Sequence, residues 1–192
     1  MDTQLPIYQV EIDEAEGLQA MAFVDRPAIK QNWVAFAEQI MLAINDEKHI
    51  VTGPALIPEQ PIYRNDAILG ECYISFSAQT IEKCVERFMQ DGLTKSVNLM
   101  HNSGVPEMDI TLVESWIVNR AMNKQPLAGY EGLPDGTWFV GYKVNNQEVW
   151  DKVKDGTIRG FSIEGVFNMR PQQLSDDMFL KNIFEKINNF LK

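Results

Sequence analysis

The sequence has few of the residues that bind soft metals or form disulfides. Its 192 residues include two cysteines and two histidines, and Cys72 and Cys84 are not in CxxC spacing. A structural zinc site needs about four such ligands, and disulfides persist in oxidising compartments. No carboxylate cluster with metal-ligand spacing stands out. We therefore expect no disulfide, no metal and no cofactor.

Long apolar runs and an excess of basic residues are also missing. The start, MDTQLPIYQVEIDEAEG, is acidic where a secretory segment would be basic and then apolar. No apolar run approaches the roughly 20 residues of a membrane helix. The 17 basic residues are outnumbered by 27 acidic ones, which disfavours nucleic acid or an anionic membrane as partner. The sequence predicts a soluble intracellular protein and leaves a peptide or basic partner open.

Apolar residues make up 45% of the chain, including ten Phe, and their spacing predicts mainly strands. Length favours one well-buried domain. The three prolines Pro54, Pro58 and Pro61 predict that the strand beginning near residue 50 breaks into extended, turn-rich chain. Alternating or β-branched patterns predict strands over 5–13, from 17 to a stop at Pro27, and over 110–118, 138–144 and 158–169.

Helical spacing is clearest over 77–91, where Ser77 can cap the first turn and Gly92 follows the last. A short helix is predicted within 145–156, while 33–43 is rich in helix formers with a strand left open for its first half. The tail 175–192 is amphipathic. We expect a β-rich α+β domain over 1–170 with about three helices, and an amphipathic helical tail over 171–192.

Ser162 is the candidate nucleophile. It lies in G-F-S-I-E-G on a predicted strand, flanked by Gly160 and Gly165. Glycines in a strand leave no side chain to pack, so the pair suggests close backbone approach by something else, of which a peptide substrate lying alongside is one example. The alternative is an ordinary strand serine near a bulge. The motif differs from the G-x-S-x-G elbow of the α/β-hydrolases.

A serine hydroxyl needs a neighbouring base, and histidine is the usual one because its ordinary pKa lies near 6.5. His49 follows a charged run and is predicted to be a solvated residue. His101 ends the apolar segment VNLM and precedes the turn NSG, so it is placed at a strand end that can border a site.

A third group would accept the other N–H of the imidazole and hold its tautomer. Glu114 is the leading candidate because it is a lone acid within the apolar strand ITLVESWIV, and a buried carboxylate needs a partner. The alternative for Glu114 is an edge-strand residue facing water. Glu164 is the second candidate, since residues two apart on a strand share a face, here with Ser162.

Several further segments stand in a fixed order along the chain: FVDRPAI, ALIPEQPIYR, YISFS with TIEK, VNLMH, VESWIV, LPDGTWFVGYKV and VKDGTIRGFSIEG. Together they resemble a known family, the XkdF-like phage serine proteases, which belong with the prohead proteases related to herpesvirus assemblin. The resemblance extends from about Leu5 to about Phe167, and several motifs in order are far more specific than one.

The resemblance implies an assemblin-like closed or nearly closed β-barrel surrounded by helices, with His101 as the catalytic histidine and Ser162 as the nucleophile. In assemblin the third member is a histidine downstream of the serine, but no histidine follows Ser162 here. The site therefore uses an acid such as Glu114, or acts as a dyad. The relatives' oxyanion hole uses backbone N–H groups and arginine-assisted donors, for which Arg170 is a candidate.

Three functions compete. The first is a maturation endopeptidase that works in the host cytoplasm inside the assembling prohead, on scaffolding protein, major capsid protein and itself; a homodimer is left open. The second is an inactive scaffolding or assembly protein that keeps the protease fold. The third is an acyl hydrolase for small esters, which has no elbow motif behind it. The presence of both His101 and Ser162 favours the first, because a purely structural descendant has no reason to keep both.

Overall fold

The computed structural model describes residues 5–12, 17–24, 42–66, 69–100 and 109–171. These ranges contain eleven strands, two α-helices and two short 3₁₀ helices. In chain order the elements are β1 Ile7–Glu11, β2 Gly17–Val24, β3 Ala43–Asn45, β4 Ile50–Leu56, β5 Ile62–Asp66, β6 Gly70–Ser75, α1 Ala78–Gln90, η1 Leu93–Lys95, β7 Val97–Leu99, β8 Ile110–Ile117, η2 Arg120–Met122, β9 Trp138–Val144, α2 Gln147–Lys154, β10 Gly160–Val166 and β11 Asn168–Pro171.

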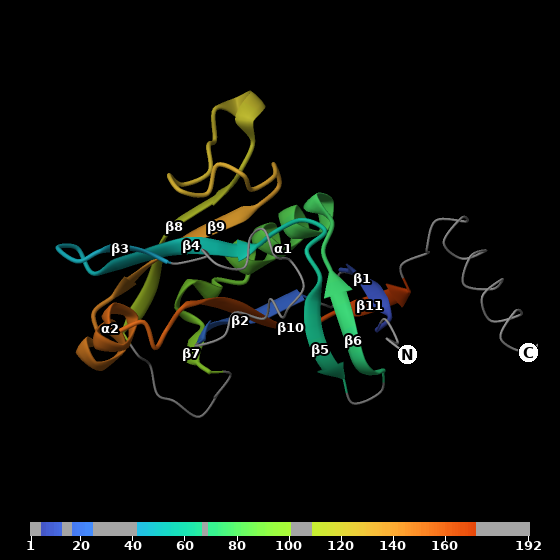
Figure 1. The fold of residues 1–192 in the computed structure, drawn as a ribbon, viewed down its shortest axis with the longest axis horizontal. Coiled ribbons are helices and arrows are strands. Elements are labelled where there is room, and N and C mark those ends of the chain that lie inside the picture. Colours follow the sequence, from blue (N-terminus) through green and yellow to red (C-terminus); the bar gives the residue numbers. More distant parts are fainter. Residues whose placement is uncertain (1–4, 13–16, 25–41, 67–68, 101–108, 172–192) are drawn as a thin grey trace, which may run out of the picture.

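The strands form three sheets, with the orders β11-β1-β6-β5, β10-β2-β7 and β3-β4-β9-β8 (Figure 1). The pairs β1–β6 and β2–β7 are parallel. The remaining pairs are antiparallel. Neighbours that are distant in sequence, such as β2 between β10 and β7, bring the two halves of the chain together.

The predicted closed or nearly closed barrel ringed by helices is wrong for the described residues, because no sheet there closes on itself. Closure requires an unbroken ladder of hydrogen bonds around the ring. Strands β10 and β4 instead meet through side-chain packing: a Cβ at Gly53 would lie 3.6 Å from the ring of Phe161. The same ranges contain only the two α-helices α1 and α2, so helices do not ring the strands.

One hydrophobic core joins all three sheets and both helices. At its centre the rings of Phe23, Tyr142 and Phe161 pack together, with the Phe23 centroid 5.4 Å from Tyr142 and 5.1 Å from Phe161. These rings come from β2, β9 and β10, so they connect two different sheets. Aromatic pairs at these distances add to the stability given by area burial alone.

Local predictions are confirmed where the structure describes the chain. Ser77 caps α1, its side chain accepting from Thr80 N at 3.0 Å, and Gly92 follows in the left-handed region with φ 68°. The broken strand near residue 50 is partly wrong: β4 runs through Pro54, and its register shifts only between Pro54 and Leu56. Of the segment 33–43, residues 33–41 lie outside the described residues and Ala43 begins β3. The predicted helical tail over 175–192 also lies outside them.

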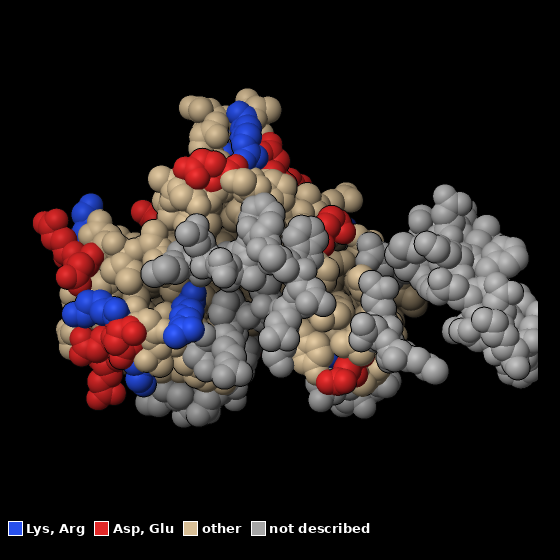
Figure 2. Space-filling view, in the orientation of Figure 1, with Lys and Arg blue, Asp and Glu red and all other residues tan. Residues whose placement is uncertain are grey.

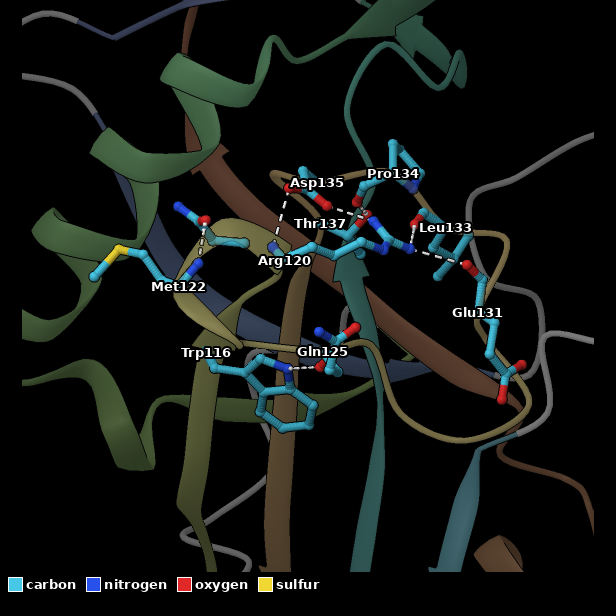
Figure 3. Close-up of polar contacts among 10 residues, drawn as sticks. Trp116, Arg120, Met122, Gln125, Glu131, Leu133, Pro134, Asp135 and Thr137 are labelled. Atoms are coloured by element: carbon cyan, nitrogen blue, oxygen red, sulfur yellow. Dashed lines mark hydrogen bonds and ion pairs between the residues drawn. The ribbon is translucent and has the colours of Figure 1, made fainter.

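The connection from β8 to β9 is held by Arg120, as Figure 3 shows. Its guanidinium pairs with Asp135 and donates to the carbonyl oxygens of Glu131 and Leu133 at 2.9 and 2.8 Å. Hydrogen bonds from the Arg120 backbone N–H and then from its guanidinium lower the pKa of Asp135. Beneath this connection the Trp116 ring stacks on Phe139 with centroids 5.0 Å apart.

At the end of the molecule where the β3–β4 turn and α2 lie, acidic and basic side chains are intermixed (Figure 2). Among them is the pair Lys154–Asp151 on α2, at 3.6 Å. Such mixing weakens the local field that a net charge of -10 would otherwise produce. Within the described ranges, none of the helices has the length and apolar character needed to cross a membrane.

The hydroxyl of Tyr142 is buried in the core without a hydrogen-bond partner, and burial raises the pKa of this phenol. We expect Tyr142→Phe to stabilise the fold by about 1 kcal/mol, since an unpaired buried polar group costs about that or more. The melting temperature should rise by about 2–4 °C in a calorimetric scan.

Thr137→Val is the matched control. The Thr137 hydroxyl is also fully buried but donates to Pro134 O at 2.8 Å, so its removal leaves an unpaired acceptor and should lower the melting temperature. An equal fall in melting temperature in Tyr142→Phe and Thr137→Val would mean that the Tyr142 hydroxyl has a hydrogen-bond partner.

Candidate active site

Ser162 lies on the face of the β10-β2-β7 sheet that points away from the main core. Its neighbours Phe161 and Ile163 belong to that core, and the alternation of a strand turns Ser162 to the other side. Ser162 is in register with Ala22 on β2, and Ala22 with Asn98 on β7. We call this side, with Ser162, Ala22, Asn98, Ala20 and Glu164, the Ser162 face.

Two polar side chains on the Ser162 face are buried without partners. Ser162 is 4% exposed and Asn98 is 6% exposed. Neither the Ser162 Oγ nor the Asn98 Oδ1 has a hydrogen-bond partner. Between them, Ala22 contributes only a methyl group and is fully buried. A hydroxyl held in a fixed place with no hydrogen bond to lose is suited to take part in chemistry with a bound group.

The predicted base, His101, lies outside the described residues. The strand that precedes it, β7, ends at Leu99 and pairs in parallel with β2. Met100 still follows β2, because its N–H donates to Phe23 O at 2.9 Å, and it has a left-handed φ of 53°. The described chain therefore runs along the Ser162 sheet up to the residue before His101.

Glu114 lies on β8, at the edge of the β3-β4-β9-β8 sheet, and not on the sheet of Ser162. Its side chain is exposed, so the expectation of a buried carboxylate is not met. It lies over Gly141 on β9 and accepts a hydrogen bond of 3.4 Å from Thr52 Oγ1 on β4. Gly141 makes this possible, because a Cβ there would be 2.6 Å from Glu114 Oε2.

Glu114, Gly141 and Thr52 are cross-strand neighbours in one sheet. In the same strand as Thr52, Gly53 packs against Phe161, the residue before Ser162. The Glu114 row therefore belongs to the β3-β4-β9-β8 sheet, and Ser162 to the β10-β2-β7 sheet.

Glu164 shares the Ser162 face, as its spacing predicts, and is half-buried. Directly after it the register with β2 shifts between Glu164 and Gly165. Gly165 is required by the chain's own backbone, since a Cβ there would lie 2.4 Å from Gly17 O. The expected close backbone approach is therefore confirmed at Gly165, where the approaching backbone is that of the chain's own Gly17. The bulge of the alternative interpretation is also present.

Two other residues singled out in the sequence have structural partners. Arg170 on β11 pairs with Glu11 on β1, with Nε 2.8 Å from Oε2, and β11 is in a different sheet from Ser162. His49 is half-buried and stacks on Trp150, with ring centroids 4.7 Å apart and an interplanar angle of 8°. His49 therefore has a packing role, where the sequence predicted a solvated residue.

Both cysteines are buried and neither forms a disulfide. Burial raises the pKa of the Cys84 thiol to about 12, so this side chain stays protonated and unreactive at neutral pH. In the part of the chain that the structure describes, no group of three or more His, Cys, Asp or Glu side chains could hold a metal ion.

Sequence reasoning missed Asn98 and Ala22. It treated Asn98 as part of an apolar segment leading to His101. A polar residue between Val97 and Leu99, whose side chains pack on the core, was the available signal that Asn98 faces the other way.

Ser162 on β10 and the strand that leads to His101, β7, thus belong to one sheet and are separated by β2. The chain belongs to the family described as "Putative phage serine protease XkdF", whose model matches residues 37–170. The match includes Ser162, His101 and both candidate acids. Searches among curated proteins and among solved structures give no match.

Proposed function

We propose that this chain is the maturation protease of a phage prohead, a serine endopeptidase with Ser162 as nucleophile and His101 as general base. The observation that carries the proposal is the Ser162 hydroxyl, buried on a face of small residues and without a hydrogen-bond partner. Membership of a family of phage serine proteases adds to it. The sequence offers no other histidine with a free role, because His49 stacks on Trp150.

In the proposed reaction, His101 takes the hydroxyl proton while Ser162 Oγ attacks the carbonyl carbon of the scissile peptide bond. The tetrahedral intermediate collapses to an acyl-enzyme as the imidazolium gives its proton to the leaving amine. Water, deprotonated by the same imidazole, then attacks the ester and releases the second product with Ser162 restored. Each proton is returned, so the cycle needs no cofactor.

The proposed substrates are the scaffolding protein, the major capsid protein and the protease itself, cleaved inside the assembling prohead. This part rests on the resemblance to prohead proteases and on the phage origin named for the family. Confinement with its substrates in one closed shell would give the protease a high effective concentration of them.

Purified chain incubated with the scaffolding protein of the same phage tests the function. We expect intact-mass measurement to find defined scaffold fragments. Because Ser162 is nearly fully buried, a substrate reaches it only if the Ser162 face opens, so labelling with a small fluorophosphonate is a second measurement. Intact scaffold and unlabelled Ser162 would instead favour the inactive scaffolding protein.

We further propose that Glu114 is the acid that orients His101, and the pH–rate profile tests it. Glu114→Gln should cut the rate by about a hundredfold to ten-thousandfold. Loss of the negative charge should also lower the pKa of the histidine. Because the base works when deprotonated, the acid limb of the profile should move to lower pH.

Glu164→Gln is the matched comparison, since Glu164 lies on the Ser162 face. We expect it to lower the cleavage rate less than Glu114→Gln does and to leave the acid limb of the pH–rate profile unchanged. If Glu164→Gln collapses activity and Glu114→Gln behaves like wild type, the two roles are exchanged. If neither matters, the site is a Ser–His dyad.

A further inference from the structure

Asn98 has a buried acceptor that the protein itself does not use. Four buried side-chain atoms lack hydrogen-bond partners among the described residues. Two of them, Ser162 Oγ and Asn98 Oδ1, lie in one row of the same sheet, across Ala22. The other two, on Ser75 and Tyr142, belong to other sheets. This row therefore has two unpaired polar groups on one face, whereas Ser75 and Tyr142 are single unpaired groups on separate sheets.

An unpaired buried amide is costly, and each such group in a folded protein calls for an explanation. One explanation is a ligand that supplies the missing hydrogen-bond partner. The position of Asn98 limits which chemical groups that ligand can carry. Strands are about 4.8 Å apart, so Asn98 and Ser162 are separated by roughly 10 Å between their Cα atoms. Ala22 places no larger side chain between them.

A group bound at both residues must bring a carbonyl carbon to Ser162 and a hydrogen-bond donor to Asn98 Oδ1. An extended peptide carries both in its main chain, where each residue offers one N–H and one C=O. Adjacent residues of an extended chain are spaced about 3.3 Å apart, so about three residues span the distance. A small ester has no such donor.

We propose that Asn98 is a substrate-binding residue whose Oδ1 accepts a main-chain N–H of the peptide substrate, about three residues from the bond that Ser162 attacks. The proposal rests on the proposed function and adds to it the class of substrate, a main chain in extended conformation. It also assigns a role to a residue that is neither the nucleophile nor the base.

Two isosteric variants separate this role from the others. Asn98→Leu removes the acceptor, and Asn98→Asp keeps an oxygen acceptor at the same place. Each is assayed for cleavage of the scaffolding protein, with kcat and KM determined, and for the rate at which a small fluorophosphonate, which has no peptide N–H, labels Ser162. Ser75→Ala is the control, as it removes an unpaired buried hydroxyl from a different sheet.

We expect Asn98→Leu to lower kcat/KM for scaffold cleavage by about tenfold or more, the scale of one lost hydrogen bond, while the labelling rate stays within about twofold of wild type. Its melting temperature should not fall, because the Asn98 Oδ1 has no protein partner to lose. Asn98→Asp should cleave faster than Asn98→Leu, and Ser75→Ala should cleave like wild type. If Asn98→Leu does not fold, Asn98→Ala takes its place in the same comparison.

Cleavage by Asn98→Leu at the wild-type rate overturns the inference. An equal loss of fluorophosphonate labelling in Asn98→Leu also overturns it, because it would indicate that Asn98 donates to the oxyanion. Slower scaffold cleavage by Asn98→Asp than by Asn98→Leu overturns it as well. In all three cases Ser162→Ala still lacks activity, and the proposed function stands. If Ser162→Ala itself cleaves scaffold, the proposed function fails and the role of Asn98 fails with it.

Discussion

Replacing Ser162 with Ala should abolish proteolysis and leave the fold intact. Loss of the nucleophile of a serine protease typically lowers kcat by roughly a millionfold, so scaffold cleavage should fall below detection. The melting temperature should stay the same or rise slightly, because the Ser162 Oγ has no hydrogen-bond partner in the folded protein. Intact-mass analysis of the cleavage reaction and a calorimetric scan of the same sample measure both effects.

Ser75→Ala is a close control for this experiment. Ser75 is 2% exposed, and its hydroxyl also lacks a hydrogen-bond partner. It lies on β6, in the β11-β1-β6-β5 sheet, whereas Ser162 lies in the β10-β2-β7 sheet. The two variants undergo the same chemical change at the same degree of burial. Wild-type cleavage by Ser162→Ala, or equal loss of cleavage in both variants, would remove the reason to assign Ser162 as nucleophile.

His101→Ala should be nearly as inactive as Ser162→Ala, since the hydroxyl is a poor nucleophile without a base. Groups that act as one unit are not additive. The double variant should therefore be no slower than either single variant, and fluorophosphonate labelling of Ser162 should be lost in His101→Ala. Rates of scaffold cleavage for the three variants, measured at one pH, give the comparison.

His49→Ala serves as the control for histidine loss. It removes a ring that stacks on Trp150, a contact of about 0.5–1.5 kcal/mol in aromatic pairs. We expect a lower melting temperature with unchanged turnover by the folded enzyme. Near-normal turnover in His101→Ala together with inactive, folded His49→Ala would show that the base is His49.

Elements whose signals are local could be predicted from the sequence. The helix over 78–90 has a capping serine before it and a glycine after it, and both act as predicted. Strand β9 alternates residues of the main core with residues on the other face of its sheet, among them Phe139 of a second, smaller core. Caps and periodicity depend on neighbours within a few residues, so they can be read without knowing the rest of the fold.

The site was predicted less completely, because its geometry depends on pairing between distant segments. Glu114 was expected to be a buried carboxylate, but it is exposed and accepts a hydrogen bond from Thr52. Its position follows from Gly141, a residue of a different strand, which leaves space for the carboxylate. Similarly, Gly165 is explained by the backbone of Gly17 and not by a visiting peptide.

The sequence by itself determined the class of this protein: a β-rich domain with its strands and capped helices, and membership of a family of putative phage serine proteases. Only the tertiary structure decided that the strands form three sheets and that Ser162, Ala22 and Asn98 lie in one row. The physical reason is that register and sheet closure are set by hydrogen bonds and packing between segments far apart in the chain, and no local pattern encodes them.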